Sequence, residues 1–300
     1  MEKTTHVTSE LNINNIKSFL EDIESFIFDC DGVLWRADEA VENAAQTIAF
    51  LREQGKKVIF LTNNSTKTRN DFLHKIKSFG IDCNIDEVFS SSYGAQVYLS
   101  KINFQQKLFM IGEKGLEEEL RPLGLEIIKN FEKTNDGIDN VQHIEPDHSI
   151  GAVIIGMDTS YTYQKGVYAH KLLAENPNIL FIATNTDPSY PVKNGKSLPG
   201  AGSIVTMIAT STGRKPNAIM GKPEQLLLDL ILESHSLNRA KTCVVGDRMD
   251  TDILFGVRGN TKTLLVYTGV TKKEELPSFE YQPQYDTRTI GDLFTLFQKL

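Results

Sequence analysis

Short apolar runs alternate with helix-length amphipathic segments along this chain of 300 residues. That alternation is typical of a parallel sheet whose strands are joined by crossover helices. Each run ends in polar residues or glycine, and in open α/β sheets ligands bind beyond the carboxyl ends of the strands. The first set of strands is predicted at 26–28, 58–61, 218–220, 242–245 and 263–266.

A second set of apolar runs lies in the middle of the chain. Strands are predicted there at 108–111, 152–155 and 179–183, and helices at about 114–123 and 162–175. The stretch 129–149 is polar and weakly patterned, so we interpret it as a loop or an irregular hairpin. Two α/β sets predict an α/β protein with two domains.

Charge and cysteine usage narrow the class of protein. The formal net charge of -7 argues against nucleic acid or an anionic membrane as the main partner. The three cysteines, Cys30, Cys83 and Cys243, lack the spacing of metal ligands. A cysteine count this small and odd suits a reducing compartment better than a disulfide scaffold. The N-terminus has no apolar signal core, and no stretch is long and apolar enough to span a membrane. We therefore expect a cytoplasmic protein without a membrane partner.

Two aspartates follow the first predicted strand. Asp29 and Asp31 come directly after the run 26–28, and Gly32 would let the chain leave the strand sharply. One carboxylate there can bind a hard cation and attack phosphorus, while the other exchanges a proton with the leaving oxygen and with water. The same residues also fit a surface turn. A calcium loop would need further acids, which 33–36 does not supply.

Small polar residues follow the predicted strand 58–61. Thr62, Asn63, Asn64 and Ser65 lead into a helical pattern, and a hydroxyl with exposed backbone N–H groups at a helix start suits a phosphate. Beside the first motif we favour phosphate binding by Thr62 Oγ1 and the N–H of Asn63, with Asn64 next to them. Asn64 or Ser65 could equally cap the helix, and the two roles are compatible.

A lysine follows the run 218–220. The ammonium of Lys222 could neutralise a phosphate and the carboxylate that attacks it. The alternative is a solvated lysine before a helix opened by Pro223.

Three acids crowd the segment after the run 242–245. Asp247, Asp250 and Asp252 would repel one another unless a cation lies among them, although helix capping alone enriches acids at such a place. Asp247 is nearest the strand end and is our first choice for a metal ligand. Asp252 is the second, either as a ligand through water or as support for Lys222 or Asp247. Asp250 is interpreted as a surface acid.

These four stretches together resemble the motifs of haloacid dehalogenase-like phosphatases, in order and each after a strand. The likeness extends from about Ser25 to the C-terminus and is specific as a combination, although each motif alone is weak or moderate. The stretches that carry it are 29–33, 62–65, 221–223 and 246–253.

The resemblance implies a role for each matching residue. Asp29 would be the nucleophile and a Mg²⁺ ligand, and Asp31 the general acid and base with its backbone carbonyl on the metal. Lys222 would balance charge, and Asp247 would complete the metal ligands. Thr62 and Asn63 would hold the phosphoryl oxygens. Because Asp31 is present, phosphatase chemistry is favoured over dehalogenase chemistry.

The position of the insert indicates which subgroup of the family this chain resembles. Little chain lies between Asp31 and Thr62, while a long insert lies between Thr62 and Lys222. We therefore predict a Rossmann-like core domain formed by 1–104 and 216–300 and an α/β cap domain at 105–215. This arrangement resembles the p-nitrophenylphosphatase, phosphoglycolate phosphatase and pyridoxal phosphate phosphatase group. Relatives often dimerise through the cap, so the resemblance implies a homodimer.

Substrate specificity is expected to come from the cap, chiefly from the segment 184–191. Pyridoxal-phosphate-selective relatives stack a histidine from this loop on the ligand, and the matching position here is Tyr190. A tyrosine could still stack, or it could pack within the cap. We favour a small phosphomonoester such as 2-phosphoglycolate, with p-nitrophenyl phosphate as an artificial substrate and pyridoxal phosphate as the alternative. The glycine-rich run 199–203 is interpreted as the return from cap to core.

A hypothesis of another class is a regulatory protein that binds phosphoryl groups without catalysis. Such a protein would be expected to lack Asp29, Asp31 or Asp247, and all three are present.

Overall fold

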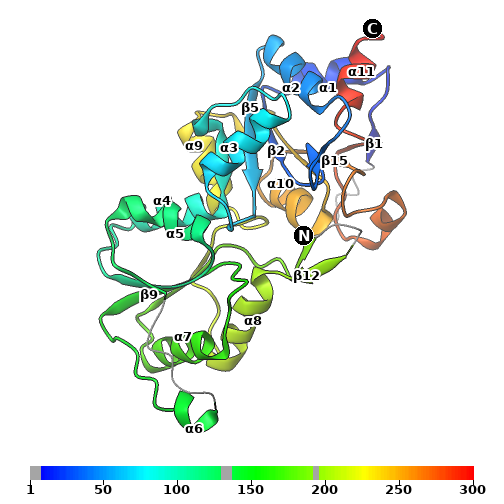
Figure 1. The fold of residues 1–300 in the computed structure, drawn as a ribbon. Coiled ribbons are helices and arrows are strands. Elements are labelled where there is room, and N and C mark those ends of the chain that lie inside the picture. The colour runs from blue at the N-terminus through cyan, green and yellow to red at the C-terminus, as the bar shows by residue number, and fades with distance from the viewer. Residues whose placement is uncertain (1–7, 130–136, 192–195) are drawn as a thin grey trace. The chain divides into compact units, whose positions relative to one another are not determined.

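The computed structural model describes residues 8–129, 137–191 and 196–300, which form two compact units. The first unit contains the chain up to Thr62, Asn70–Phe89 and Lys222–Leu300, and the second contains Asn63–Arg69 and Ser90–Gly221. Figure 1 shows the helices and strands of both units.

The first unit is built on a seven-stranded sheet in which β2 lies between β14 and β5, parallel to both. Its strands, in spatial order, are β1 (Ser9–Glu10), β16 (Tyr285–Thr287), β15 (Lys262–Val266), β14 (Thr242–Gly246), β2 (Ser25–Asp29), β5 (Lys57–Thr62) and β6 (Val88–Ser90). All residues of β14 are buried, and so are the first four of β2, as expected for a parallel strand covered on both faces.

Helices bury the apolar residues of this sheet. Phe19, Leu51 and Leu293, from three of these helices, join Phe26 and Phe28 of β2 in one hydrophobic core. The helices are α1 (Ile16–Asp22), α2 (Ala44–Glu53), α3 (Arg69–Ser78), α9 (Leu226–Ser234), α10 (Leu254–Arg258) and α11 (Asp292–Phe297). The shorter elements are β3 (Trp35–Arg36), β4 (Glu39–Ala40), η1 (Ile85–Glu87), η4 (Arg239–Lys241), the π-helical turn η5 (Met249–Ile253) and η6 (Lys273–Ser278).

The second unit has its own five-stranded sheet and its own core. The strands are, in spatial order, β13 (Ala218–Ile219), β10 (Leu180–Ala183), β9 (Ile150–Ile155), β7 (Lys107–Ile111) and β8 (Ile127–Ile128). The other elements are α4 (Ser91–Lys101), α5 (Lys114–Leu120), η2 (Arg121–Leu123), α6 (Ile138–Val141), α7 (Tyr163–Glu175), α8 (Ala201–Thr212) and the hairpin strands β11 (Ser189–Pro191) and β12 (Ser197–Pro199).

The predicted fold class is confirmed, with an α/β insert between the second and third motifs. The boundaries 1–104, 105–215 and 216–300 stay a prediction. In the described parts of the chain, no helix combines the length and apolarity needed to cross a bilayer.

Three interpretations are corrected by the structure. The run 218–220 was grouped with the first set of strands, but β13 pairs with β10 in the other sheet. The stretch 129–149 contains the helix α6, while 130–136 lies outside the described residues. The run 199–203 does not return to the first unit: it opens α8, whose first residues pack against the loop before β11.

Candidate active site

The nucleophile predicted from the sequence stands at the end of the central strand. Asp29 is the last residue of β2, and β2 is fixed on both sides, by β14 and by β5. In β5, Leu61 pairs with Asp29, so Thr62 follows immediately and lies buried at the end of its strand. Asp247 follows β14 in the same way. Parallel pairing therefore brings all three residues to one edge of the sheet.

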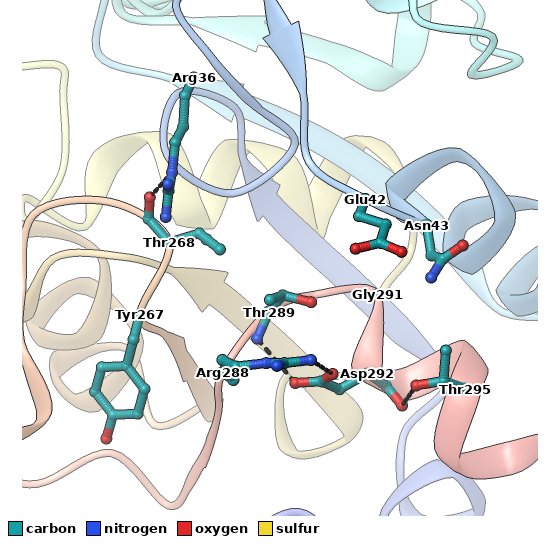
Figure 2. A pocket seen from close by; sticks show the side chains of 10 residues that line it. All are labelled: Arg36, Glu42, Asn43, Tyr267, Thr268, Arg288, Thr289, Gly291, Asp292 and Thr295. Atoms are coloured by element: carbon teal, nitrogen blue, oxygen red, sulfur yellow. Dashed lines mark hydrogen bonds and ion pairs between the residues drawn. The ribbon is translucent and has the colours of Figure 1, made fainter. Parts of the chain in front are cut away.

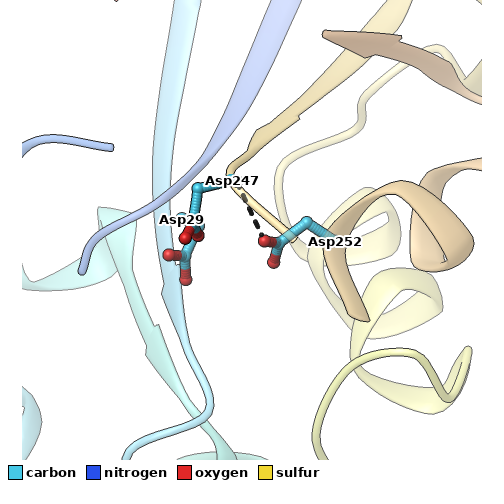
Figure 3. Close-up of side chains that lie close together, drawn as sticks. All are labelled: Asp29, Asp247 and Asp252. Atoms are coloured by element: carbon cyan, nitrogen blue, oxygen red, sulfur yellow. Dashed lines mark hydrogen bonds between the residues drawn. The ribbon is translucent and has the colours of Figure 1, made fainter. Parts of the chain in front are cut away.

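Three carboxylates meet at this edge. One oxygen from each of Asp29, Asp247 and Asp252 lies within 4.8 Å of the others. Figure 3 shows the three side chains close together. Two glycines leave room for Asp247: a Cβ on Gly32 would lie 2.7 Å from its Cγ, and a Cβ on Gly269 would lie 1.8 Å from its Oδ2. Both separations are far below van der Waals contact, so the backbone is shaped around this carboxylate.

Lys222 lies beside two of these acids. Its Nζ donates to Oδ1 of Asp29 at 2.5 Å and lies 2.7 Å from Oδ1 of Asp252. The lysine side chain is only 3% exposed, which rules out the alternative of a solvated lysine. Burial by itself lowers the pKa of Lys222, but the carboxylates of Asp252 and Asp29 outweigh burial and raise this pKa. The two carboxylates therefore favour the charged form of Lys222.

One ammonium does not offset three carboxylates, of which Asp247 and Asp252 are buried and Asp29 is partly buried. Burial raises the pKa of Asp29 well above its ordinary value, against the opposing effect of Lys222. Burial and the neighbouring Asp252 raise the pKa of Asp247 to about 7. A divalent cation would supply the missing positive charge. The donor set consists of carboxylate oxygens, the ligands that Mg²⁺ prefers, so the residues fit this ion.

Asp252 supports its neighbours. Its Oδ2 accepts the backbone N–H groups of Asp247 at 3.2 Å and Arg248 at 3.1 Å, while Oδ1 faces Lys222. The π-helical turn η5 carries this carboxylate back to the end of β14. Asp250, on the same turn, is exposed and pairs with Arg248, in agreement with its interpretation as a surface acid.

Asp31, the predicted general acid, has two partners that the sequence did not reveal. Trp35 Nε1 donates to Oδ1 of Asp31 at 2.7 Å, and Nζ of Lys75 lies 3.8 Å from the same oxygen. Neither Trp35 nor Lys75 is among the site residues predicted from the sequence. A helical lysine in α3 carries no sequence signal that would single it out.

The residues after Thr62 belong to the second unit. Asn63 Nδ2 donates to both carboxylate oxygens of Asp187, at 3.1 and 3.3 Å. Asn64 Oδ1 accepts from the N–H and the hydroxyl of Thr66 and so shapes a local turn. The helix cap predicted at Asn64 or Ser65 is wrong, because α3 begins only at Arg69.

Tyr190 lies on β11 and is half-buried. Its hydroxyl accepts from Asn64 Nδ2 at 3.4 Å, so it is connected to the residues that follow Thr62. Glycines shape the loop before Tyr190: a Cβ on Gly200 would lie 2.3 Å from the carbonyl oxygen of Asp187. Asp187 lies in the predicted segment 184–191 without a role of its own there, and its contact with Asn63 makes it part of this network.

A separate cavity of about 390 Å³ lies in the first unit (Figure 2). Arg36 and Arg288 contribute its guanidinium groups, and Glu42 and Asp292 its acids. The described residues that line it include none of the predicted site residues. Thr268 connects it to the loop that follows Asp29, because its hydroxyl donates to the carbonyl oxygen of Gly32 at 2.5 Å.

Comparison with known proteins agrees with this geometry. The model of the family "Haloacid dehalogenase-like hydrolase" matches residues 26–126, and a HAD-hydrolase-like model matches residues 219–293. Phosphoglycolate phosphatase 1A of Arabidopsis thaliana is 37% identical over 97% of this chain and 82% of its own length. The chain belongs to the haloacid dehalogenase-like hydrolases. It is a phosphatase.

Two other phosphatases support this assignment. The 4-nitrophenylphosphatase of Schizosaccharomyces pombe is 39% identical to this haloacid dehalogenase-like hydrolase, over 87% of this chain and 89% of the relative. The crystal structure of the 4-nitrophenylphosphatase from Thermotoga maritima superposes with a TM-score of 0.80 at 30% identity, covering 92% of this chain and 98% of that one. The resemblance inferred from the four motifs is thereby confirmed.

Proposed function

We propose that this phosphatase hydrolyses small phosphomonoesters with Mg²⁺ through an aspartyl-phosphate on Asp29. The observation that carries the proposal is the approach of three carboxylates to within 4.8 Å beside the buried ammonium of Lys222. Asp29, Asp247 and the backbone carbonyl of Asp31 would hold the ion. When bound, Mg²⁺ would offset the repulsion between an anionic nucleophile and an anionic ester.

The residues of the chain then divide the chemistry between them. An oxygen of Asp29 forms a bond to phosphorus, the ester P–O bond breaks, and the leaving oxygen takes a proton from Asp31. Asp31 next takes a proton from water, whose oxygen attacks phosphorus. The bond between Asp29 and phosphorus breaks, and phosphate leaves with Asp29 again a carboxylate. Thr62 and Asn63 would hold the phosphoryl oxygens throughout.

Asp252 has a distinct part in this proposal. Its contacts with Lys222 and with two backbone N–H groups favour the role of support over that of a direct metal ligand. A contact with the ion through water is compatible with this role.

The substrate that we propose is 2-phosphoglycolate, with p-nitrophenyl phosphate as an artificial substrate. The names of the relatives support both compounds. Tyr190 is proposed to contact the organic part of the substrate, because it is bonded to Asn64, next to a predicted phosphate ligand. Pyridoxal phosphate remains the alternative, since a tyrosine can stack on its ring. The homodimer and the cytoplasmic location implied by the resemblance and composition stay predictions.

The test is a phosphate-release assay with Mg²⁺ on 2-phosphoglycolate, pyridoxal phosphate, p-nitrophenyl phosphate and nucleoside monophosphates. We expect turnover by the wild type, none by Asp29→Asn, and none after thorough chelation. Tyr190→Ala should raise KM for the preferred substrate, while Tyr190→Phe keeps the ring and serves as its control. Phosphate binding without turnover in the wild type would instead favour the regulatory alternative.

A further inference from the structure

Among the described residues, the side-chain partners of Asp31 contact one of its two oxygens. In the part of the chain that the structure describes, its side-chain hydrogen bond from Trp35 and its ion pair with Lys75 both go to Oδ1. The side chain of Asp31 is 46% exposed, so the carboxyl would otherwise be free to rotate. One hydrogen bond and one nearby positive charge, both at Oδ1, favour a single orientation of the carboxyl group.

The indole that makes this hydrogen bond is itself fixed. Trp35 is completely buried, and its ring stacks on Phe79 with the centroids 5.4 Å apart. A tight turn returns the chain beside Asp31, since the N–H of Gly32 donates to the carbonyl oxygen of Trp35 at 2.7 Å. Nζ of Lys75 lies 4.5 Å from the centroid of the same ring, a cation–π contact that places its charge near Oδ1.

The chemistry of the two partners distinguishes the oxygens of Asp31. An indole N–H and an ammonium can only donate, so a proton on Oδ1 would meet donors and no acceptor. We propose that Trp35 and Lys75 are positioning residues that hold Oδ1 of Asp31 and leave Oδ2 as the oxygen that carries the proton to the leaving group. This inference rests on the proposed function, in which Asp31 is the general acid.

A loss of positioning at Asp31 should affect good and poor leaving groups differently, whereas a purely structural defect should affect them equally. Proton donation matters more for a poor leaving group than for a good one. Phenyl phosphate and p-nitrophenyl phosphate have similar shapes, but phenolate is the poorer leaving group. Loss of positioning should therefore lower kcat/KM more for phenyl phosphate. We compare kcat/KM because it includes the step in which the ester bond breaks, and this step differs between the two esters. The later breakdown of the aspartyl-phosphate is the same for both.

The experiment measures kcat/KM for both esters in Trp35→Phe and Lys75→Met, with Mg²⁺ present. Trp35→Phe removes the N–H and keeps an aromatic ring, and Lys75→Met keeps the aliphatic stem. Each variant is expected to reduce kcat/KM for phenyl phosphate about tenfold more than for p-nitrophenyl phosphate, a fraction of the full effect of a general acid. Lys75→Arg should largely restore the wild-type ratio. Phe79→Leu removes the ring that stacks on the indole but keeps the indole N–H, and should change the ratio less than Trp35→Phe does.

A spectroscopic measurement gives a second readout. Trp35 is the single tryptophan of the chain, so tryptophan fluorescence reports on the surroundings of this one indole, which include Asp31. Asp31→Ala should shift its emission, whereas Asp250→Ala, at an exposed acid, should not.

Three outcomes are informative. A wild type that hydrolyses neither ester contradicts the proposed function itself. An active wild type whose Trp35 and Lys75 variants lose activity equally on both esters, or lose none, overturns only this inference. A selective loss on phenyl phosphate supports it.

Discussion

Nζ of Lys222 lies 2.5 Å from Oδ1 of Asp29, a residue 193 positions away in the chain. Both side chains are largely buried, and the ammonium also faces Asp252 at 2.7 Å. A buried charge is tolerated only when it is paired, so these groups depend on one another for stability as well as for chemistry.

Loss of this ammonium should therefore destabilise the protein. Lys222→Met leaves two buried carboxylates facing each other without a cation, and we expect the free energy of unfolding of the metal-free protein to fall by about 3 kcal/mol. Urea denaturation in the presence of a chelator measures the change. Lys241→Met is the matched control, because Lys241 makes a 2.6 Å ion pair with Glu24 at the surface and should contribute little. Equal stability of the two variants would contradict the prediction.

The raised pKa of Asp247 predicts a stability that depends on pH. Its pKa is about 7 in the folded protein and near 3.8 when exposed, so the folded state binds the proton more tightly. The contribution of Asp247 to the free energy of unfolding is fully present below about pH 4. It is lost as pH rises through 7, and the loss amounts to up to about 4 kcal/mol in metal-free protein. Asp247→Asn cannot ionise there.

Urea denaturation of both proteins at pH 5 and pH 8, with chelator, checks this pH dependence. Asp247→Asn should gain stability relative to the wild type at pH 8, and Mg²⁺ should stabilise only the wild type. If the free energies of unfolding of the two proteins differ by the same amount at pH 5 and pH 8, the raised pKa of Asp247 is refuted.

Two glycines with positive φ should respond differently to alanine. Gly32 has φ +90 and would place a Cβ 2.7 Å from Asp247, whereas Gly55 has φ +72 and open space around it. Both substitutions should cost about 1 kcal/mol of stability through backbone strain. Only Gly32→Ala should also raise the Mg²⁺ concentration needed for half-maximal activity, as measured by metal titration. A similar increase in Gly55→Ala would show that strain alone is responsible.

The support given by Asp252 predicts a selective loss of activity. Asp252→Asn keeps the size of the side chain but removes the charge that faces Lys222, and we expect kcat/KM to fall about 10- to 100-fold. Asp250→Asn changes an exposed acid on the same turn and should leave kcat/KM unchanged. Steady-state kinetics with p-nitrophenyl phosphate measures both, and similar values for the two variants would argue against a supporting role.

Much of the site could be predicted because strand ends are visible in the sequence. Asp29, Thr62 and Asp247 each follow a short apolar run, and parallel pairing necessarily brings such positions to one edge. The run 218–220 was equally clear as a strand, but its sheet was not. Apolar residues show that a strand is buried and do not show which neighbour it pairs with.

The sequence by itself determined the α/β class, the insert and the acids and lysine of the site, because these depend on local patterns and on the order of motifs. Only the tertiary structure decided what each side chain faces. It placed Lys222 between Asp29 and Asp252, and Trp35 and Lys75 on one oxygen of Asp31. Such contacts join residues through packing and side-chain direction, and neither is encoded in the spacing of residues along the chain.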